Sequence, residues 1–429
     1  MKTSKAALAL AAVVLSAAAC GGTDSGGSAS KEFTFWSMHK QDEPRAKIVQ
    51  AAAAEFTKAT GIKVNIVFQG RENIKKLQPT LVSGNVPADL VDNGQSNILN
   101  LMQVTGQAKD LSAVYQQKAG TEGGTVGDAV PDGYEKLITD KGAKYMVPTT
   151  LHTWQVWYDG ARLPEVAAKP PQTFDELIAA LDASKAVGRP AIAVDGDILG
   201  YVAQWVSHSM MRELGPGGFA KVLTDKSGAG FDNPGVLKAA QNIERIAKGK
   251  YMIDGWDTSK FPAIQQKWAQ GQADFLFLGS YGPGETAEVA GPKFAYRSFP
   301  FPKTAAGFAS NEVNLFGFAV PAKAKNAENA EKFIAFFMDK KWLGQIPGAE
   351  KVLTVRTDTD TPPQLADVKK VLDAGGDVHL QLDGVSTMAD WKTKIYDPMC
   401  KDLFGGKISA ADFVAQLKTK TVDWWKVNA

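Results

Sequence analysis

Hydrophobic and polar residues follow two different periods near the start of the chain. Residues 32–36 (EFTFW) and 62–68 (IKVNIVF) are rich in β-forming side chains and predict two strands. The segment between them has apolar residues at i, i+3, i+4 and i+7 of a helix: Val49, Ala52, Ala53 and Phe56. Gly61 is the predicted end of this helix. Strand, helix and strand in this order form a βαβ unit, so we expect a largely parallel sheet covered by helices.

Helix and strand signals continue toward the end of the chain. Thr173 and Glu176 have the spacing of a capping box before an apolar run. Residues 261–270 and 273–278 predict a helix followed by a buried strand. Further helix starts are predicted at polar residues: Asn233, Asn326 and Ser409. The pattern predicts an α/β protein with a helical C-terminal portion.

Residues 1–20 have a pattern of their own. Two lysines precede the apolar run 6–15, and small residues then lead to Cys20. This pattern is typical of a secretory signal peptide, here residues 1–19. A cysteine at such a junction is the lipid acceptor of bacterial lipoproteins, so we expect Cys20 to carry a palmitate-type anchor; the alternative is a plain signal peptide. Residues 20–31 contain many Gly and Ser and predict a flexible, lipid-anchored linker.

Composition narrows the classes of protein. Without the signal, about 410 of the 429 residues remain, more than one core usually holds, so we expect two domains. The net charge of +2 and the lack of a basic block argue against nucleic-acid binding. No later segment approaches the apolar run of about 18 residues that spans a membrane, so the lipid is the expected membrane contact. With Cys20 acylated, Cys400 has no disulfide partner.

Signatures of catalysis and metal binding are weak. The run GPGETA at 282–287 only superficially matches a dinucleotide fingerprint, since Pro283 interrupts the loop. Neither a G-x-S-x-G segment nor a P-loop occurs. Asp383 and Asp390 are a conceivable hydrolase pair with no other support. The histidines have no metal-type spacing: His39, His152, His208 and His379. We therefore expect no enzyme activity, no cofactor and no metal.

The chain resembles the extracellular solute-binding lipoproteins of ABC importers, in the sugar-binding branch that includes maltose-binding protein. The likeness rests on loose motifs in the family's order: FTFW, LVSGNVPADLVDN, TGQAKDLS, KYMVPTTLHTWQVWYD, PQTFDELIAAL, WAQGQADFLFLGSY and FGFAVPAKAKNAENAEKFIAFF. The chain departs from the family pattern at Ala88, an extra residue before Asp89, and at Asp159, where the family usually has Asn.

The resemblance implies a two-lobed periplasmic-binding-protein-like fold, with hinge crossovers near Pro148 and residues 299–302. Lobe 1 is expected at 32–149 plus 300–343, and lobe 2 at 150–299 plus 344–429. The protein would be a monomer on the extracellular face of the cell membrane. It would close on a sugar or oligosaccharide and deliver it to the permease subunits of an ABC importer. The alternatives are a secreted glycoside hydrolase and a receptor for a peptide or polyamine.

Sugars present apolar faces and a rim of hydroxyls, so aromatic rings and neutral polar side chains are the expected contacts. Trp36 ends the first strand and His39 follows it, at the edge where open α/β sheets bind ligands. Packing is an equal alternative for Trp36. Asn93 and Gln95 follow a later strand, where the resemblance implies cleft lining and Asn93-Gly94 also fits a simple turn.

The remaining candidates lie further along the chain. His152 and Trp154 follow Pro148 at the first crossover, where the alternative for His152 is a structural hinge histidine. Tyr201 and Trp205, four residues apart, would share a helix face, either as a stacking platform or as a core stripe. Tyr281, at the end of an apolar strand, stands where the family places its main stacking aromatic. For the last three, binding and packing remain equal alternatives: Asn314, Phe316 and Trp391.

Overall fold

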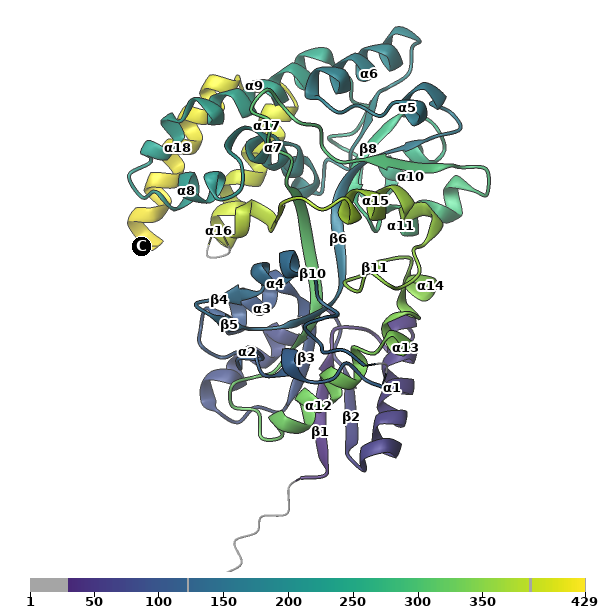
Figure 1. Cartoon of the computed structure of the whole chain (residues 1–429). Coiled ribbons are helices and arrows are strands. Elements are labelled where there is room, and N and C mark those ends of the chain that lie inside the picture. Colours follow the sequence, from purple (N-terminus) through teal and green to yellow (C-terminus); the bar gives the residue numbers. More distant parts are fainter. Residues whose placement is uncertain (1–29, 122, 386–387, 429) are drawn as a thin grey trace, which may run out of the picture. The chain divides into compact units, whose positions relative to one another are not determined.

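The computed structural model describes residues 30–121, 123–385 and 388–428 (Figure 1). The predicted signal peptide and the lipidation residue Cys20 lie outside the described residues. Lys31–Ala429 forms one compact unit. Its strands, in chain order, are β1 (Glu32–Ser37), β2 (Lys63–Phe68), β3 (Leu90–Gly94), β4 (Thr139–Asp140), β5 (Ala143–Lys144), β6 (Val147–Asp159), β7 (Ile192–Ala193), β8 (Phe275–Gly279), β9 (Tyr296–Phe299), β10 (Asn311–Ala319), β11 (Leu353–Thr354) and β12 (Val378–His379).

Helices account for much of the remaining chain, especially after β10. In chain order they are α1 (Pro44–Thr60), α2 (Asn73–Ser83), α3 (Gln95–Ile98), α4 (Asp132–Leu137), α5 (Pro164–Ala168), α6 (Phe174–Ala186), α7 (Leu199–Leu214), α8 (Gly218–Thr224), α9 (Pro234–Gly249), α10 (Ala263–Ala269), α11 (Gly282–Ala290), α12 (Ala327–Phe337), α13 (Lys340–Leu343), α14 (Ile346–Glu350), α15 (Ala366–Asp373), α16 (Ala389–Trp391), α17 (Asp397–Phe404) and α18 (Ala410–Asn428). The expected α/β class and the helical C-terminal portion are both present.

Ten strands of the described chain form one sheet with the main order β2-β1-β3-β10-β6-β8-β7. The first βαβ unit is as predicted, because β1 and β2 pair in parallel and α1 connects them. The expectation of a largely parallel sheet is wrong: β10 is antiparallel to β3 and β6, and β6 is antiparallel to β8. The prediction extended one βαβ unit to the whole sheet, whereas the chain between β9 and β10 contains no crossover helix.

β6 is the longest strand and has two sets of partners. Its residues 147–153 pair with β10, and its residues 154–158 pair with β8. Figure 1 shows β6 and β10 side by side along this shared region. Because side chains alternate along a strand, neighbouring residues of β6 can pack in different surroundings. Trp157 belongs to one hydrophobic cluster, while Val156 and Tyr158 belong to another.

The predicted helix starts are largely confirmed. Thr173 and Glu176 form the capping box, Asn233 accepts the N–H of Gly235 at 2.9 Å, and Ser409 Oγ accepts the N–H of Asp412 at 3.1 Å. Asn326 is an exception, since its side chain makes no cap and instead donates to Asp89 Oδ2 at 3.1 Å. These caps fix where the helices around the sheet begin.

The helix predicted over 261–270 and the strand predicted over 273–278 are both present with shifted bounds, as α10 and β8. The start of α10 is set by Asp195, whose carboxylate oxygens accept the backbone N–H groups of Ile264 and Gln265 at 2.9 and 3.1 Å. Pro262, which has no N–H to donate, directly precedes the helix.

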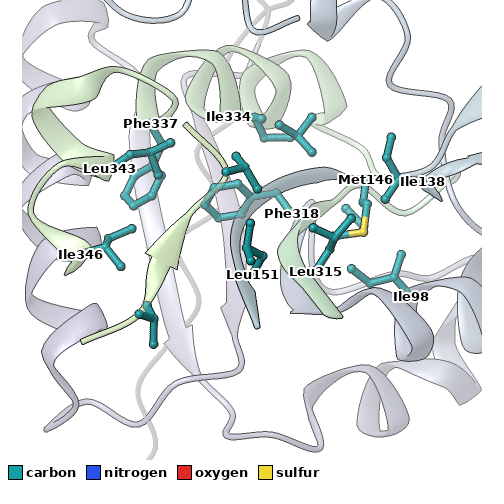
Figure 2. Close-up of a cluster of buried hydrophobic side chains, with 14 of the residues drawn as sticks. Ile98, Ile138, Met146, Leu151, Leu315, Phe318, Ile334, Phe337, Leu343 and Ile346 are labelled. Atoms are coloured by element: carbon teal, nitrogen blue, oxygen red, sulfur yellow. The ribbon is translucent and has the colours of Figure 1, made fainter. Parts of the chain in front are cut away.

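The first cluster of buried hydrophobic side chains packs around β1, β10 and α12. The ring of Phe333 lies 5.6 Å from that of Phe33, and the ring of Phe318 lies 5.7 Å from that of Phe35. Figure 2 shows part of this cluster, with contributions from strands and helices far apart in sequence: Ile98, Ile138, Met146, Leu151, Leu315, Phe318, Ile334, Phe337, Leu343 and Ile346. Each fully buried side chain of this kind stabilises the fold by about 1.5–3 kcal/mol.

The second cluster packs around α7, α9, α17 and β8. Trp205 is fully buried at its centre, with its ring 5.0 Å from Phe277, 6.0 Å from Phe301 and 5.6 Å from Phe404. Trp157 and Tyr158 are fully buried as well, as expected for strand packing. No helix among the described residues combines the length and apolar character needed to cross a membrane.

Candidate functional site

A cavity of about 310 Å³ lies where the middle of the sheet meets α3, α7, the start of α11 and the turn Gln381–Gly384. Several predicted site residues line it: Gln95, His152, Trp154, Tyr281 and Asn314. Residues up to 219 positions apart in the sequence, Gln95 and Asn314, thus lie around one cavity. A larger hollow of about 510 Å³ lies around Leu353 and α15, and it contains none of the predicted site residues.

Three rings form an aromatic wall of the cavity. His152 and Trp154 project from the same side of β6, because side chains repeat every second residue along a strand. The His152 ring lies edge-to-face with Tyr281, with centroids 5.6 Å apart. Gly279 faces Trp154 across the β6–β8 ladder, and a Cβ at that position would collide with the Tyr281 ring. The glycine therefore lets the tyrosine ring fold back over the end of β8.

Burial keeps His152 neutral. It lowers the pKa of His152 to about 4, with a smaller contribution from the positive charge of Arg45. Its Nδ1 lies 3.4 Å from Ser280 Oγ. A neutral imidazole has one donor and one acceptor nitrogen, so it can pair with a hydroxyl group that either donates or accepts a hydrogen bond.

The α3 side of the cavity provides neutral polar groups. Gln95 is buried and its Nε2 donates to the Tyr145 hydroxyl at 2.5 Å. Asn97 and Asn100 also line the cavity, and Asn100 Oδ1 has no hydrogen-bond partner within the described residues. Neither asparagine was a predicted site residue, although the two are three positions apart, a spacing that places them on one helix face.

The predicted site residues also miss a buried carboxylate and its neighbours. Glu312 lines the cavity, and its Oε1 accepts a hydrogen bond from Gln204 Nε2 at 3.0 Å. Burial raises the pKa of Glu312 to about 7. Lys392 completes this side and donates to Asp397 Oδ2 at 2.7 Å. A sequence signal existed for Glu312, because it shares a strand face with Asn314 at a spacing of two.

Trp36, His39 and Asn93 do not line this cavity. Asn93 is buried and organises the backbone, since its Nδ2 donates to Asn73 Oδ1 at 2.6 Å and its Oδ1 accepts from Gly94 N at 2.7 Å. Asn93 and Gly94 are the last two residues of β3 and pair with β10, so the turn alternative for them is wrong. Trp36 is half-buried against the first cluster, and its carbonyl accepts from Asn73.

His39 belongs to a separate group of charged side chains. Its Nδ1 lies 2.9 Å from Glu43 Oε2, and its Nε2 lies 3.8 Å from Asp92 Oδ2. Arg71 pairs with the same Glu43 oxygen at 2.8 Å. Burial, with the nearby Arg45 charge, lowers the pKa of His39 to about 4, and burial raises the pKa of Asp92 to about 6. These contacts hold the turn after β1.

Tyr201 and Phe316 form a second layer behind the aromatic wall. Tyr201 packs edge-to-face on Trp154 at 5.8 Å and hydrogen-bonds the Tyr281 side chain. Phe316 packs on His152 at 5.3 Å. Both rings are half-buried, and they support the cavity residues without lining the cavity themselves.

Trp205 and Trp391 lie in the second hydrophobic cluster, and each is fully buried. Trp391 stacks on Tyr396 with centroids 5.1 Å apart, and its Nε1 donates to Thr421 Oγ1 at 2.9 Å. The core-stripe alternative therefore describes Trp205, because the face of α7 that carries it packs against β8 instead of facing the cavity.

Asp383 and Asp390, the conceivable hydrolase pair, contact different parts of the chain. Asp383 accepts the backbone N–H groups of Gly217 and Ala220 at 3.0 and 2.9 Å, whereas Asp390 pairs with Lys394 at 2.7 Å. Neither lines the cavity. Among the described residues, no group of three or more His, Cys, Asp or Glu side chains is arranged to hold a metal ion. The cavity offers aromatic rings, amides, one serine hydroxyl, one imidazole, one carboxylate and one lysine ammonium.

Comparisons with known proteins give a family profile and sequence relatives. The sequence profile of a family described as "Bacterial extracellular solute-binding protein" matches residues 41–342. A "Probable sugar-binding periplasmic protein" of Brucella suis biovar 1 is 26% identical over 307 residues, covering 67% of this chain and 71% of that protein.

Solved structures show the same fold. The structure of apo RafE from Streptococcus pneumoniae matches with a TM-score of 0.75 at 16% identity, over 93% of this chain and 99% of that chain. A cyclo/maltodextrin-binding protein complexed with maltotetraose matches with a TM-score of 0.71 at 15% identity, over 93% and 98% of the two chains. The fold is therefore the mixed α/β periplasmic-binding-protein fold.

The placement of Trp205 in the core predicts its effect on stability. We expect Trp205→Ala to lower the free energy of unfolding by about 3–5 kcal/mol, because it opens a large void among packed rings. Urea unfolding measures the change. Phe308→Ala is the control, since that ring is 40% exposed and its removal should cost no more than about 0.5 kcal/mol. Unchanged stability of the Trp205 variant would contradict the core placement.

Proposed function

The chain belongs to the bacterial extracellular solute-binding protein family, and on that premise we propose that it captures a sugar or oligosaccharide in the cavity lined by His152, Trp154 and Tyr281. It then delivers the sugar to the permease subunits of an ABC importer. Proteins of this family bind solutes without catalysing a reaction on them. The observation that carries the proposal is the aromatic wall facing neutral polar side chains in one cavity.

This combination suits a sugar for a physical reason. Aromatic rings cover the apolar C–H faces of a pyranose, while amides and a neutral imidazole pair with its hydroxyls. A buried polar group that finds no partner is costly, so such a cavity discriminates between arrangements of hydroxyls. The sugar-binding name of the Brucella suis relative and the maltotetraose bound to one structural neighbour support the same ligand class.

The other functions have less support. A glycoside hydrolase needs two carboxyl groups flanking one bond, and Glu312 is the one Asp or Glu side chain among the described cavity residues. A polyamine receptor needs several acidic groups in its site, and this cavity has mostly amides. A peptide receptor would pair its ligand with an open strand edge, whereas the cavity lies on β6, which is already paired with β10 and β8.

We propose that capture involves closure of two lobes about β6 and β10. The second hydrophobic cluster lies within the proposed second lobe except for Phe301, and β6 and β10 both contribute residues to the cavity. We keep the proposed lobe boundaries of 32–149 plus 300–343 and 150–299 plus 344–429. The first cluster contains residues of both ranges, among them Phe33 and Trp268, and thus continues across the proposed hinge. A ligand that contacts both lobes would stabilise the closed arrangement.

We also propose that the mature protein is a monomer held at the extracellular face of the membrane by a lipid on Cys20. The support is the order of charged, apolar and small residues before that cysteine. One lipid-modified residue followed by a Gly/Ser-rich linker would leave the binding domain free to meet both solute and permease.

A saccharide should stabilise the purified protein without being consumed. At about 100 times its dissociation constant, the ligand should add roughly 2.7 kcal/mol to the free energy of unfolding. A thermal-shift screen against mono- and oligosaccharides, including raffinose, maltotetraose and N,N′-diacetylchitobiose, measures the effect. Chromatography of the incubated sugar is the control for turnover. Steady release of hydrolysed product would move the assignment to a hydrolase.

Truncating Tyr281 should weaken sugar binding more than it weakens folding. We expect Tyr281→Ala to cost about 1–3 kcal/mol of binding, because a ring that covers a sugar face is lost. Tyr281→Phe retains the ring and should keep most of the affinity. Calorimetric titration gives the affinities, and melting temperatures report on folding. Equal affinity of wild type and Tyr281→Ala would exclude a stacking role for this ring.

Removal of Cys20 should release the protein from the membrane. Cells that express wild type or Cys20→Ala are labelled with a fatty-acid analogue and separated into membrane and soluble fractions. We expect label and membrane association for wild type alone, because the thiol is the proposed acceptor. Cys400→Ala is the matched control and should behave as wild type, since Cys400 is fully buried. Label on the Cys20 variant would contradict the anchor.

A further inference from the structure

Two buried side chains at one end of the cavity have unused capacity to accept hydrogen bonds. Glu312 and Gln204 are 3% and 2% exposed, and both line the cavity. Gln204 Nε2 is the one protein donor to the Glu312 carboxylate in the described part of the chain, although a carboxylate can accept about four hydrogen bonds. Gln204 Oε1 has no partner within the described residues. These two side chains are called the acceptor pair.

Among the described residues no cation forms an ion pair with this carboxylate, although the Lys392 charge favours its ionised form. Lys392, the nearest cation on the cavity wall, is engaged by Asp397. Arg212, a buried cation on α7, donates to the carbonyls of Phe301 and Ser310. A buried carboxylate with one neutral hydrogen bond destabilises the empty protein. A ligand that brings further donors to this place would relieve that cost.

We propose that the acceptor pair selects the ligand by receiving two adjacent hydroxyl groups of one neutral sugar unit, with Glu312 ionised in the complex. This inference rests on the proposed sugar-binding function and names the part of the ligand that the cavity recognises. Two acceptors side by side match two neighbouring hydroxyl donors, and hydrogen bonds to an ionised carboxylate are stronger than those to a neutral group. A sugar acid would be rejected, because its carboxylate would meet another buried negative charge.

Glu312 changes its charge near neutral pH, whereas the histidines around it do not. The titratable and charged groups on the surrounding elements are His152, His208, Tyr281, His379, Lys392, Arg212 and Asp383. Burial lowers the pKa values of His152 and His379 to about 4 and about 3, and lowers that of His208 well below its usual range. All three imidazoles are therefore neutral between pH 6 and pH 8, where Glu312 changes its charge.

The direction of the pH effect follows from the ionised complex. Burial raises the pKa of Glu312 to about 7 in the empty protein, and hydroxyl donors favour the ionised form. Binding therefore lowers this pKa and releases protons near pH 7. Affinity should fall about tenfold from pH 8 to pH 6, because a growing fraction of the empty protein must lose a proton before it binds.

The test is calorimetric titration at pH 6 and pH 8, in two buffers with different ionisation enthalpies. The probes are raffinose, maltotetraose and N,N′-diacetylchitobiose, with glucuronic acid and glucosamine as charged sugars. Wild type is compared with Glu312→Gln and with Glu285→Gln. Glu285 is the matched control, since its carboxylate also accepts from a glutamine, Gln265, at 3.1 Å and does not line the cavity.

For wild type and Glu285→Gln, we expect proton release and about tenfold weaker binding of a neutral probe at pH 6. Glu312→Gln should bind that probe about tenfold more weakly than wild type at pH 8, with neither pH dependence nor proton release. The wild-type pH profile alone keeps the proposal testable should the variant fail to fold.

Other outcomes separate this inference from the function on which it rests. Neutral-sugar binding that is independent of pH, or that takes up protons, overturns the acceptor pair and leaves the sugar-binding function intact. If Glu312→Gln binds a neutral sugar as tightly as wild type does, the acceptor pair is likewise overturned and the sugar-binding function stands. Tighter binding of glucuronic acid or glucosamine overturns the neutral-ligand class. Failure of wild type to bind any saccharide overturns both proposals.

Discussion

The pairing of β6 with two different partners holds the described chain together. The first half of β6 forms a ladder with β10, and the second half forms a ladder with β8. Strands from distant parts of the sequence are thereby fixed in one sheet, and the two hydrophobic clusters form around this shared strand. The cavity lies along the same strand, because His152 and Trp154 project from β6 where its pairing passes from one partner to the other.

The cavity combines aromatic rings that are well supported by packing with buried polar side chains that lack hydrogen-bond partners. Its rings are supported from behind by Tyr201 and Phe316, and Gly279 makes room for Tyr281. Its polar side chains, in contrast, are only partly satisfied, with open acceptors on Gln204 and Asn100 within the described residues. In a folded protein such groups are usually paired. Both of these acceptors face the same cavity, where the hydroxyl groups of a bound ligand would complete their hydrogen bonding.

The sequence predicted local features well and the wider sheet poorly. The first βαβ unit, the capping box at Thr173 and the caps at Asn233 and Ser409 depend on neighbouring residues, so a single sequence reveals them. The antiparallel placement of β10 depends on how distant segments return to the sheet, which no local pattern records.

The site residues show the same distinction between features set by neighbouring residues and features set by distant segments. Gln95 and Tyr281 follow strand ends, whereas His152, Trp154 and Asn314 lie within β6 and β10, and all five reach one cavity. Trp205 and Trp391 carry the same aromatic chemistry, but the faces of their helices pack into the core. Glu312 was missed because a charged residue within an apolar strand resembles a solvated edge position. Its burial is visible only when the neighbouring helix α7 is in place.

The central claim is that a sugar occupies the cavity and contacts both sides of it. A crystal structure of the protein with the saccharide that stabilises it most strongly tests this claim directly. The account predicts electron density for a sugar ring against Trp154 and Tyr281, with hydroxyls near the polar residues that follow β3. Density for the sugar at another surface, or against residues of one side alone, would contradict it.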